Sequence, residues 1–433
     1  MTLPIMNSRH FRYVGNELQV EGVPLSRIAE KFGTPVYVYS EAALLEPLDR
    51  IRSCLSGLDH LVCFAAKANS NLSILRLFAG AGAGLDAVSG GELFRARKAG
   101  VPADRIVFSG VGKTEKEMEE ALRFGRSGIL AFNVESAEEL TVLNRVAERV
   151  GRQARFSIRL NPDVDPKTHP YISTGLRKNK FGLPRAEASR LARYSRELRW
   201  VSLRGASVHI GSQLLSLAPL REAFRNLSDF AEEIVALNIP LSHVDLGGGL
   251  GIPYRNEEAP SIESYCALIQ KEFGSNSRLA KKTSLRPKVV LEPGRLLAGN
   301  AGVLVSEILF RKKGVSRNFL IIDAAMNDLI RPALYESHHE IVPLTKSGRS
   351  RDAVFDVVGP VCETSDVFGR ARRLPGSIAR GDLVAVLSAG AYGFSMASQY
   401  NSRTRVAEVL VSGNRTRVIR RRETYEDLIR GES

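Results

Sequence analysis

The chain has 433 residues, of which 44% are hydrophobic and 25% are charged, a composition typical of globular proteins rather than disordered ones. This length exceeds the usual size of a single hydrophobic core, so two domains are expected. No apolar stretch reaches the length of a transmembrane helix, and Pro4, Asn7 and Arg9 interrupt the N-terminal residues. We therefore expect a cytoplasmic protein without a signal peptide or a membrane anchor.

The net charge is +14, from 61 basic and 47 acidic residues. The basic residues are scattered, apart from a dense run between Arg415 and Arg422, and no nucleic-acid-binding motif accompanies them. A solvated basic surface is thus favoured over a nucleic-acid partner. The cysteines are widely spaced and include no CxxC pair, which argues against both a structural zinc site and a disulfide framework.

The first element expected in chain order is a β-hairpin. Phe11 to Val14 and Leu18 to Val20 flank a turn at Gly15-Asn16. We expect residues 1–36 to join a β domain at the other end of the chain.

Residues 37–300 are expected to form a (β/α)8 barrel. Short apolar runs alternate there with longer amphipathic stretches, about eight times, as such a barrel requires. The runs are Pro35 to Tyr39, Leu61 to Ala66, Ile106 to Phe108, Phe156 to Leu160, Gly205 to Ile210, His243 to Leu246 and Val289 to Leu291. A doubly wound open sheet uses the same units and remains an alternative from periodicity alone.

Residues 301–433 predict a separate all-β domain, because strand-like runs follow one another there without long helices. These runs are Val303 to Arg311, Asn318 to Asp323, Ala353 to Val358, Asp382 to Leu387 and Val406 to Val411.

Two glycine-containing segments resemble nucleotide-binding motifs but lack the required context. Gly80 to Gly84 follows a helix and precedes a strand, the reverse of a dinucleotide fingerprint, and is interpreted as a turn. Gly112-Lys113-Thr114 ends like a phosphate-binding loop, but Val107 stands where its first glycine belongs. Thr114 is better explained as a helix N-cap, with Glu117 completing a capping box.

Other residues fall where barrel enzymes place their chemistry, at the C-terminal ends of strands. Lys67 follows such a strand and is equally consistent with an amine nucleophile and with a surface lysine. Gly247 to Gly251 favours a phosphate-binding loop over a flexible turn. Glu292 to Arg295 offers a carboxylate and a guanidinium, which elsewhere would form a plain salt bridge, and His209 ends another strand.

Together these motifs resemble the fold-type III pyridoxal-phosphate-dependent decarboxylases. The resemblance rests on Ala66 to Asn69, His209 to Gln213, Gly247 to Gly251, Glu292 to Arg295, Asp323 to Tyr335, Gly359 to Asp366 and Gly390 to Gly393. The later motifs and the loop Asn161 to Gly182 are similar to the branch that acts on diaminopimelate. Each motif is weak alone, but their shared order spans nearly the whole chain.

The resemblance implies that Lys67 carries pyridoxal 5'-phosphate as a Schiff base, that Glu292 pairs with its ring nitrogen and that His209 lies against the ring. Further cofactor contacts are implied for Ser212, Gly248, Gly249, Pro293, Gly294, Arg295 and Tyr392. The substrate would be meso-2,6-diaminopimelate, converted to L-lysine and CO2 in the last step of lysine biosynthesis. Its distal end would meet Arg295, Arg331, Tyr335, Glu363 and Tyr392.

By the same resemblance, Cys362 returns a proton after decarboxylation and reaches the site, with Glu363, from the second subunit of a homodimer. Plainer explanations remain: Arg331 and Tyr335 as a helical pair, Cys362 as a buried small hydrophobe, and Arg295 as a phosphate ligand. The closest alternative is a related decarboxylase acting on ornithine, arginine or carboxynorspermidine. A racemase of similar architecture and a cofactor carrier are less consistent with the Cys362-Glu363 pair and the β domain.

Overall fold

The computed structural model describes residues 10–165, 174–176, 179–346 and 351–433, and the chain divides into two compact units. The unit called here the barrel unit comprises Pro47–Gly251 and Ala259–Leu296. The β unit comprises the described residues up to Glu46 together with Ile252–Glu258 and Leu297–Ser433.

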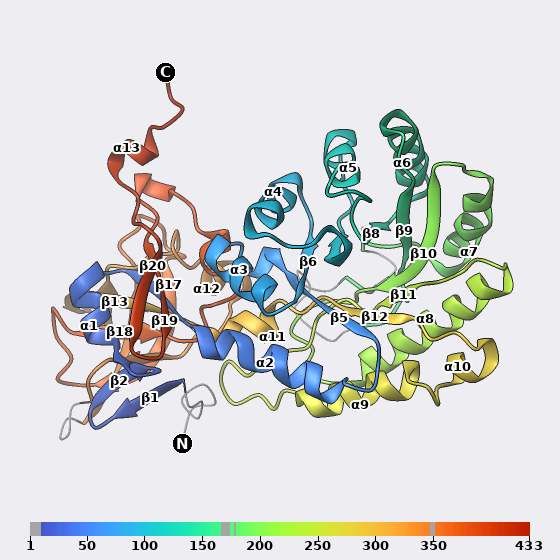
Figure 1. Cartoon of the computed structure of the whole chain (residues 1–433). Helices are drawn as coiled ribbons and strands as arrows, with labels where there is room; N and C mark the ends of the chain where they lie inside the picture. The colour runs from blue at the N-terminus through green and yellow to red at the C-terminus, as the bar shows by residue number, and fades with distance from the viewer. Residues whose placement is uncertain (1–9, 166–173, 177–178, 347–350) are drawn as a thin grey trace. The chain divides into compact units, whose positions relative to one another are not determined.

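The described strands of the barrel unit close into a parallel barrel in the order β10-β11-β12-β5-β6-β7-β8-β9, with helices around it (Figure 1). The expected barrel is confirmed, and the open sheet is excluded. The strands are β5 (His60–Ala65), β6 (Gly84–Ala87), β7 (Ile106–Phe108), β8 (Ala131–Val134), β9 (Ala154–Leu160), β10 (Val201–Val208), β11 (His243–Asp245) and β12 (Lys288–Leu291).

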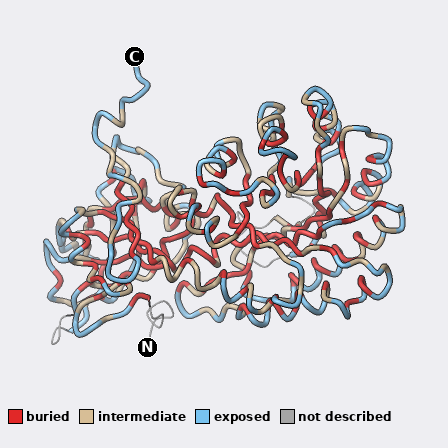
Figure 2. Tube along the Cα trace, viewed as in Figure 1, coloured by how far each residue is buried: buried red, intermediate tan, exposed pale blue. Residues whose placement is uncertain are grey.

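The helices between these strands are amphipathic, so their inner faces are buried and their outer faces exposed (Figure 2). They are α3 (Leu72–Gly80), α4 (Gly90–Ala99), α5 (Glu115–Leu122), α6 (Ala137–Val150), α7 (Arg185–Tyr194), α8 (Ala218–Ala236), α9 (Ile262–Phe273) and α10 (Arg278–Thr283). In addition, α2 (Glu41–Cys54) precedes β5, and the short α11 (Arg295–Ala298) follows β12. The predicted turn joins α3 to β6 from Gly80 to Gly84, and Thr114 and Glu117 form the predicted capping box of α5.

The described strands of the β unit include a 9-stranded sheet whose main path runs β17-β16-β14-β13-β4-β19-β20, with β15 and β18 beside it. Its strands are β4 (Val36–Ser40), β13 (Gly302–Lys313), β14 (Asn318–Ile322), β15 (Ile341–Pro343), β16 (Asp352–Val358), β17 (Val367–Pro375), β18 (Leu383–Val386), β19 (Ala407–Ser412) and β20 (Arg415–Arg420). The unit also contains the short helices α1 (Leu25–Phe32), α12 (Arg331–Tyr335) and α13 (Tyr425–Leu428).

The expectation that the run from Pro35 to Tyr39 is a barrel strand is wrong. This run forms β4, which pairs antiparallel with β13 and parallel with β19 and is buried along its whole length. A continuous apolar run suits any strand covered on both faces, so periodicity does not reveal which sheet it joins. The barrel is completed instead by β6 and by β8, a strand that the sequence did not reveal.

The predicted N-terminal hairpin is present. Strands β1 (Phe11–Val14) and β2 (Glu17–Val20) pair antiparallel, and the two-residue strand β3 (Val23–Pro24) extends them. Phe11 and Leu18 are fully buried in one apolar cluster with residues of β4, β13 and β19. The Leu18 N–H also donates to the carbonyl of Leu344 at 2.8 Å, so the hairpin packs on the sheet of the β unit.

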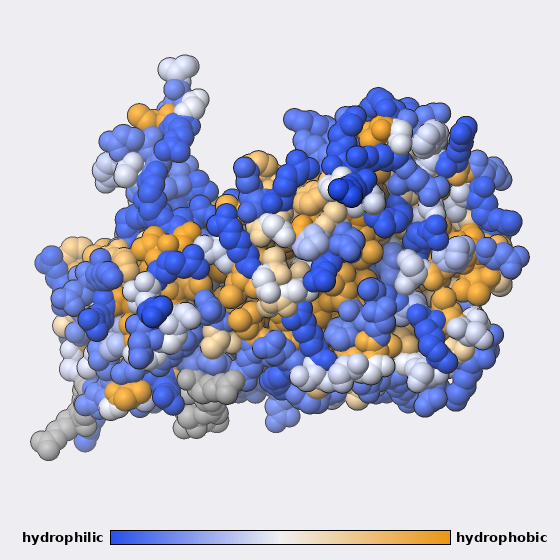
Figure 3. Space-filling view, viewed as in Figure 1, coloured by the Kyte–Doolittle hydropathy of each residue, from blue (hydrophilic) through white to orange (hydrophobic). Residues whose placement is uncertain are grey.

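The surface carries the excess of charge. On the face shown in Figure 3, hydrophilic side chains are spread over both units among smaller apolar areas. The dense basic run forms strand β20 and its continuation, where Arg420 pairs with Glu408 and Arg421 with Asp427. Among the described residues, no helix is both long enough and apolar enough to cross a membrane.

Candidate active site

Lys67 lies at the C-terminal edge of the barrel. Strand β5 ends at Ala65, and a single helical turn, Ala66–Ala68, carries the lysine just past that edge. Its Nζ is 3.0 Å from Oδ2 of Asp86, which is fully buried on the neighbouring strand β6. The side chain of Lys67 is 37% exposed, so the amine is paired and still reachable from solvent.

Glu292 follows β12, the other neighbour of β5 in the barrel. Its Oε1 accepts hydrogen bonds from Ser109 Oγ and Asn133 Nδ2, both at 3.3 Å, and the same Asn133 amide donates to Asp245 Oδ2 at 3.0 Å. Burial raises the pKa of Glu292 well above its usual range, and the nearby charge of Asp245 adds to this effect. Burial likewise raises the pKa of Asp245.

This group of acids fits a cationic ring nitrogen. In the described part of the chain, three buried carboxyl groups, those of Asp86, Asp245 and Glu292, lie near only one cation, Lys67. An added cation would therefore be stabilised there by their negative charge. Oδ1 of Asp86 and Oδ1 of Asn133 are also buried, with no hydrogen-bond partner among the described residues. A lysine amine beside such unsatisfied acceptors fits pyridoxal phosphate, which needs both an amine for attachment and a partner for its ring nitrogen.

His209 follows β10 at the same edge and is held as a neutral imidazole. The N–H of Gly248 donates to its Nδ1 at 3.1 Å, so Nδ1 presents a lone pair. Burial lowers the pKa of His209 well below its usual range, with further contributions from the charges of Lys67 and Arg159. The backbone carbonyl of His209 accepts hydrogen bonds from Thr174 Oγ1 at 2.9 Å and from Arg159 Nη2 at 3.4 Å.

The glycine loop after β11 packs closely against the rest of the site. A Cβ atom on Gly248 would lie 2.3 Å from the carbonyl oxygen of Glu292, so a larger residue there must displace one of the two segments. Gly247 and Gly249 have positive φ angles of 62° and 112°, where glycine is favoured. The N–H of Gly247 already donates to Asp245, and that of Gly248 to His209. An anion bound by this loop would therefore accept hydrogen bonds from other N–H groups.

The remaining cofactor residues predicted within the barrel unit also lie at this edge. Arg295 is buried, and its Nε donates to Ser212 Oγ at 3.1 Å. The carbonyl of Pro293, which precedes Gly294, accepts a hydrogen bond from the N–H of Ala65 at 3.2 Å and ties the end of β12 to that of β5. The barrel unit therefore brings together every cofactor residue predicted within it.

A buried ion pair supports the loop from Asn161 to Gly182. Arg159 Nη1 lies 2.8 Å from Glu135 Oε1, which also accepts from the N–H of Gly110 at 3.2 Å. The other oxygen of Glu135 accepts from the N–H of Gly182 at 3.0 Å, at the end of the loop. Residues 166–173 and 177–178 of this loop lie outside the described residues.

Apart from Arg295, the residues predicted to bind the substrate, and the predicted proton donor Cys362, lie in the β unit. Arg331 and Tyr335 begin and end α12, and Arg331 is buried. Cys362 and Glu363 are exposed on a loop that Asp366 closes by accepting hydrogen bonds from the N–H groups of Val361 and Met326. The exposure of Cys362 is inconsistent with the plainer expectation of a buried hydrophobe. Tyr392 is partly buried and has a φ of 56°.

Sequence reasoning missed the polar residues that surround these side chains. Asp86, Asn133, Arg159 and Asp245 stand within or at the end of apolar barrel strands, and Glu135 follows one directly. A polar residue near the C-terminal end of a buried strand was the available signal, because such a side chain requires a partner.

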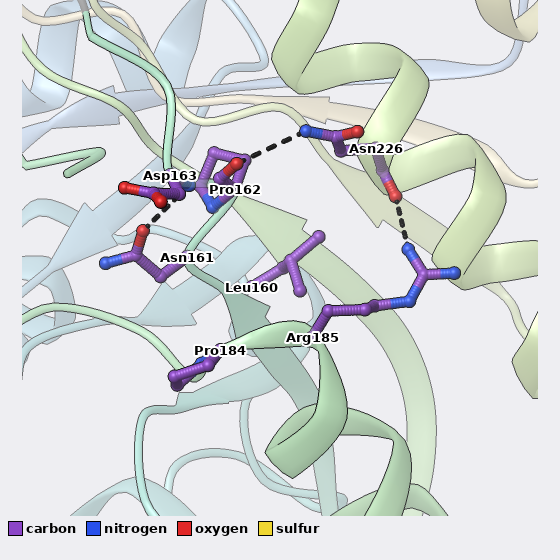
Figure 4. Close-up of a pocket in the computed structure, with 7 residues that line it drawn as sticks. All are labelled: Leu160, Asn161, Pro162, Asp163, Pro184, Arg185 and Asn226. Atoms are coloured by element: carbon purple, nitrogen blue, oxygen red, sulfur yellow. Dashed lines mark hydrogen bonds between the residues drawn. The ribbon is translucent and has the colours of Figure 1, made fainter. Parts of the chain in front are cut away.

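A separate cavity of about 320 Å³ lies beside the start of the same loop (Figure 4). Its lining includes Asn161 and Pro162 after β9, Arg185 at the start of α7 and Asn226 on α8. Arg185 donates to the carbonyl of Asn226, and the Asn226 amide donates to the carbonyl of Pro162. Its polar groups thus bind one another, and none of the predicted site residues lines it.

Comparison with known proteins decides between the candidate families. Residues 41–299 match the model of the pyridoxal-binding domain of pyridoxal-dependent decarboxylases. The chain is 44% identical to the diaminopimelate decarboxylase of Aquifex aeolicus (strain VF5), an alignment that covers 97% of this chain and 96% of that protein. The chain belongs to the diaminopimelate decarboxylase family.

Other diaminopimelate decarboxylases support this assignment. The protein from Neisseria meningitidis serogroup B is 48% identical, with 95% of this chain and 96% of the relative covered. A crystal structure of the Helicobacter pylori diaminopimelate decarboxylase complexed with L-lysine has a TM-score of 0.88 and 42% identity, covering 94% of this chain and 99% of the other. The chain is accordingly a pyridoxal-dependent carboxy-lyase with a barrel and a β domain.

Proposed function

We propose that this enzyme converts meso-2,6-diaminopimelate to L-lysine and CO2, the last step of lysine biosynthesis, as a cytoplasmic homodimer that uses pyridoxal 5'-phosphate. The observation that carries the proposal is the pairing of Lys67 with buried Asp86 at the barrel edge, between the strands that also supply Glu292. Identities of 44% and 48% over almost the full chain support the choice of substrate.

Pyridoxal phosphate, when bound, supplies an electron sink for the electron pair left behind when CO2 departs. Lys67 would offer its amine as the attachment point, Glu292 would pair with the ring nitrogen, and the neutral imidazole of His209 would lie against the ring. The other groups proposed to hold the cofactor are Ser212, Gly248, Gly249, Pro293, Gly294, Arg295 and Tyr392.

The stereochemistry of the product identifies the end of the substrate that must be gripped. Because L-lysine retains the L-configured centre, CO2 leaves from the D-configured centre. The distal L end keeps its carboxylate and its ammonium group throughout the reaction. Arg295, Arg331, Tyr335 and Tyr392 are proposed to bind the carboxylate, and Glu363 the ammonium, since a guanidinium offers two parallel donors to a carboxylate.

Cys362 is proposed to supply the final proton. The bond from the α-carbon to the carboxyl carbon breaks, and a C–H bond forms with the proton of the Cys362 thiol. Solvent then reprotonates the thiolate. Cys362 and Glu363 are proposed to act in the active site of the partner subunit.

The test of the reaction is CO2 release by purified enzyme loaded with pyridoxal phosphate. We expect release from meso-diaminopimelate, with L-lysine as product, and none from ornithine, arginine or lysine. Release from ornithine or arginine alone would reject the proposed substrate but keep the chemistry. The variant Lys67→Ala should lose both turnover and the visible absorbance of the bound cofactor, and full activity in this variant would reject the whole assignment.

Mixing two inactive variants tests the shared site. If Cys362 serves the partner subunit, an equimolar mixture of Lys67→Ala and Cys362→Ala subunits should regain about a quarter of wild-type activity. About half of the dimers are then mixed, and each mixed dimer has one of its two sites intact. Absence of recovery, with mixed dimers demonstrated by differently tagged subunits, would contradict this role.

A further inference from the structure

Arg331 is held by three side chains that are not among the proposed site residues. Its Nη1 donates to the hydroxyl of Tyr254 and to Nε2 of His339, both at 3.0 Å, and its Nη2 donates to Ser337 Oγ at 3.3 Å. The guanidinium also lies over the ring of Tyr254, with Cζ 4.9 Å from the ring centre. His339 is fully buried, and Arg331 is 4% exposed.

The partners of His339 define its protonation state. Its Nδ1 lies 2.8 Å from the carbonyl oxygen of Leu387, which can only accept, so Nδ1 carries a hydrogen. A guanidinium can only donate, so Nε2 must present a lone pair to Arg331. His339 is therefore a neutral imidazole, protonated on Nδ1, that accepts a hydrogen bond from Arg331.

We propose that His339 is a positioning residue that orients Arg331 and thereby sets the affinity for the distal carboxylate. This inference rests on the proposed function, which assigns that carboxylate to Arg331. A guanidinium binds a carboxylate through two donors only when its plane and its rotation within that plane both match. Stacking on Tyr254 fixes the plane, and the hydrogen bond to His339 fixes the rotation.

Orientation of Arg331 affects binding more than chemistry. The distal carboxylate is present in both meso-diaminopimelate and L-lysine, and the bond that breaks is at the other end of the substrate. Loss of an interaction made equally in the ground state and the transition state raises KM and leaves kcat unchanged. A misdirected Arg331 should therefore weaken the binding of substrate and product together.

Two substitutions of His339 separate this role from a purely structural one. In His339→Asn the amide nitrogen replaces Nδ1 and can still reach Leu387, but the acceptor for Arg331 is lost. In His339→Gln the amide oxygen replaces Nε2 as the acceptor, but the bond to Leu387 is lost. If His339 acts by orienting Arg331, His339→Gln should bind substrate and product more tightly than His339→Asn. If it acts only through its bond to Leu387, His339→Asn should bind them more tightly.

The experiment measures KM and kcat for meso-diaminopimelate and the Kd of L-lysine, the latter by calorimetry on the enzyme loaded with cofactor. In His339→Asn, KM and Kd should both rise roughly tenfold to a hundredfold, as expected for a lost hydrogen bond to a charged group, while kcat stays within about threefold. His339→Gln should recover most of the affinity. The adjacent His338, which bonds to Glu340, supplies the control His338→Asn, expected to bind L-lysine as the wild type does.

Wild-type affinity for L-lysine in His339→Asn, or a His339→Gln variant no better than His339→Asn, would overturn the proposal. Failure of the wild type to release CO2 from meso-diaminopimelate would instead reject the proposed function, before any variant is compared. If His339→Asn does not fold, Tyr254→Phe removes another acceptor of Arg331 but keeps the stacked ring. It should also raise the Kd of L-lysine, and an unchanged Kd there would count against orientation of Arg331 by these neighbours.

Discussion

Arg159 and Glu135 form a buried ion pair at the C-terminal edge of the barrel, with 2.8 Å between Nη1 and Oε1 and side-chain exposures of 9% and 2%. The pair joins the ends of the neighbouring strands β8 and β9, and Glu135 also binds the N–H groups of Gly110 and Gly182. Arg159 in turn donates to the carbonyl of His209. One carboxylate thus fixes three loops at the edge that carries Lys67.

Replacing Glu135 by glutamine should strongly destabilise the enzyme. The variant keeps the shape of the side chain but leaves the guanidinium of Arg159 buried without its counter-charge, which typically costs about 3–5 kcal/mol. The exposed pair between Arg50 and Glu263 gives a matched control, in which Glu263→Gln should cost at most about 1 kcal/mol. Urea unfolding of both variants measures the difference, and equal losses would contradict the importance of burial.

Replacing Glu292 by glutamine should separate cofactor attachment from catalysis. The amide cannot hold a charge opposite the ring nitrogen, so we expect kcat to fall by roughly two to three orders of magnitude, as when a preorganised electrostatic partner is removed. Lys67 and Asp86 remain intact, so the visible absorbance of the attached cofactor should persist. Unchanged kcat in a fully loaded Glu292→Gln enzyme would show that this carboxyl has no such role.

The substitution Gly248→Ala should weaken cofactor binding. The new Cβ would meet the carbonyl oxygen of Glu292 at 2.3 Å, so the glycine loop or the end of β12 must move. We expect the Kd of pyridoxal phosphate, measured by absorbance titration, to rise by about tenfold, from a displacement costing roughly 1–3 kcal/mol. Gly112→Ala is the control, because nothing lies within 4 Å of its Cβ position and its binding should not change.

His243 should make the enzyme less stable in acid. It is buried between Ser157 Oγ at 2.7 Å and Ser242 Oγ at 3.0 Å, and burial lowers its pKa from 6.5 to about 4. Between these two values the unfolded chain takes up a proton that the native imidazole does not. Stability contributed by His243 is thus complete above pH 6.5 and is lost as the pH falls toward 4, a total of about 3 kcal/mol.

The variant His243→Gln should remove that slope. The measurement compares the free energy of unfolding at pH 7 and pH 4.5, so any constant cost of the substitution cancels. The partly exposed His60, which bonds to the carbonyl of Leu58, provides the control His60→Gln. An unchanged acid sensitivity in His243→Gln would assign the effect to other groups.

The sequence alone predicted the barrel, the β domain and the N-terminal hairpin, because strand periodicity and turn residues are local features. It did not predict that β4 belongs to the β unit, since partner choice depends on residues more than 260 positions away in β13 and more than 360 away in β19. Strand β8 was missed for a different reason: its four residues, Ala131 to Val134, include the polar Asn133 and so lack a plain apolar run.

At the active site, the sequence predicted the residues that carry recognisable motifs and missed their supports. Lys67 and Glu292 stand in short signatures at strand ends. Asn133 and Asp245, which are hydrogen-bonded to one another, come from strands separated by a long stretch of chain, and only the closed barrel brings them together. The predicted roles of Cys362 and Glu363 depend on a partner subunit, so the sequence and a single chain carry little information about them.

The position of β4 has a consequence for how the chain folds during synthesis. This strand leaves the ribosome long before β13 and β19, between which it is inserted. At usual rates of translation the delay before β19 appears is roughly 20 to 75 s. The barrel can close during this interval, while the buried apolar strand β4 still lacks its neighbour β19. We therefore expect nascent chains to need protection of residues 36–40, and a fragment ending near residue 300 to aggregate unless the first 46 residues are also removed.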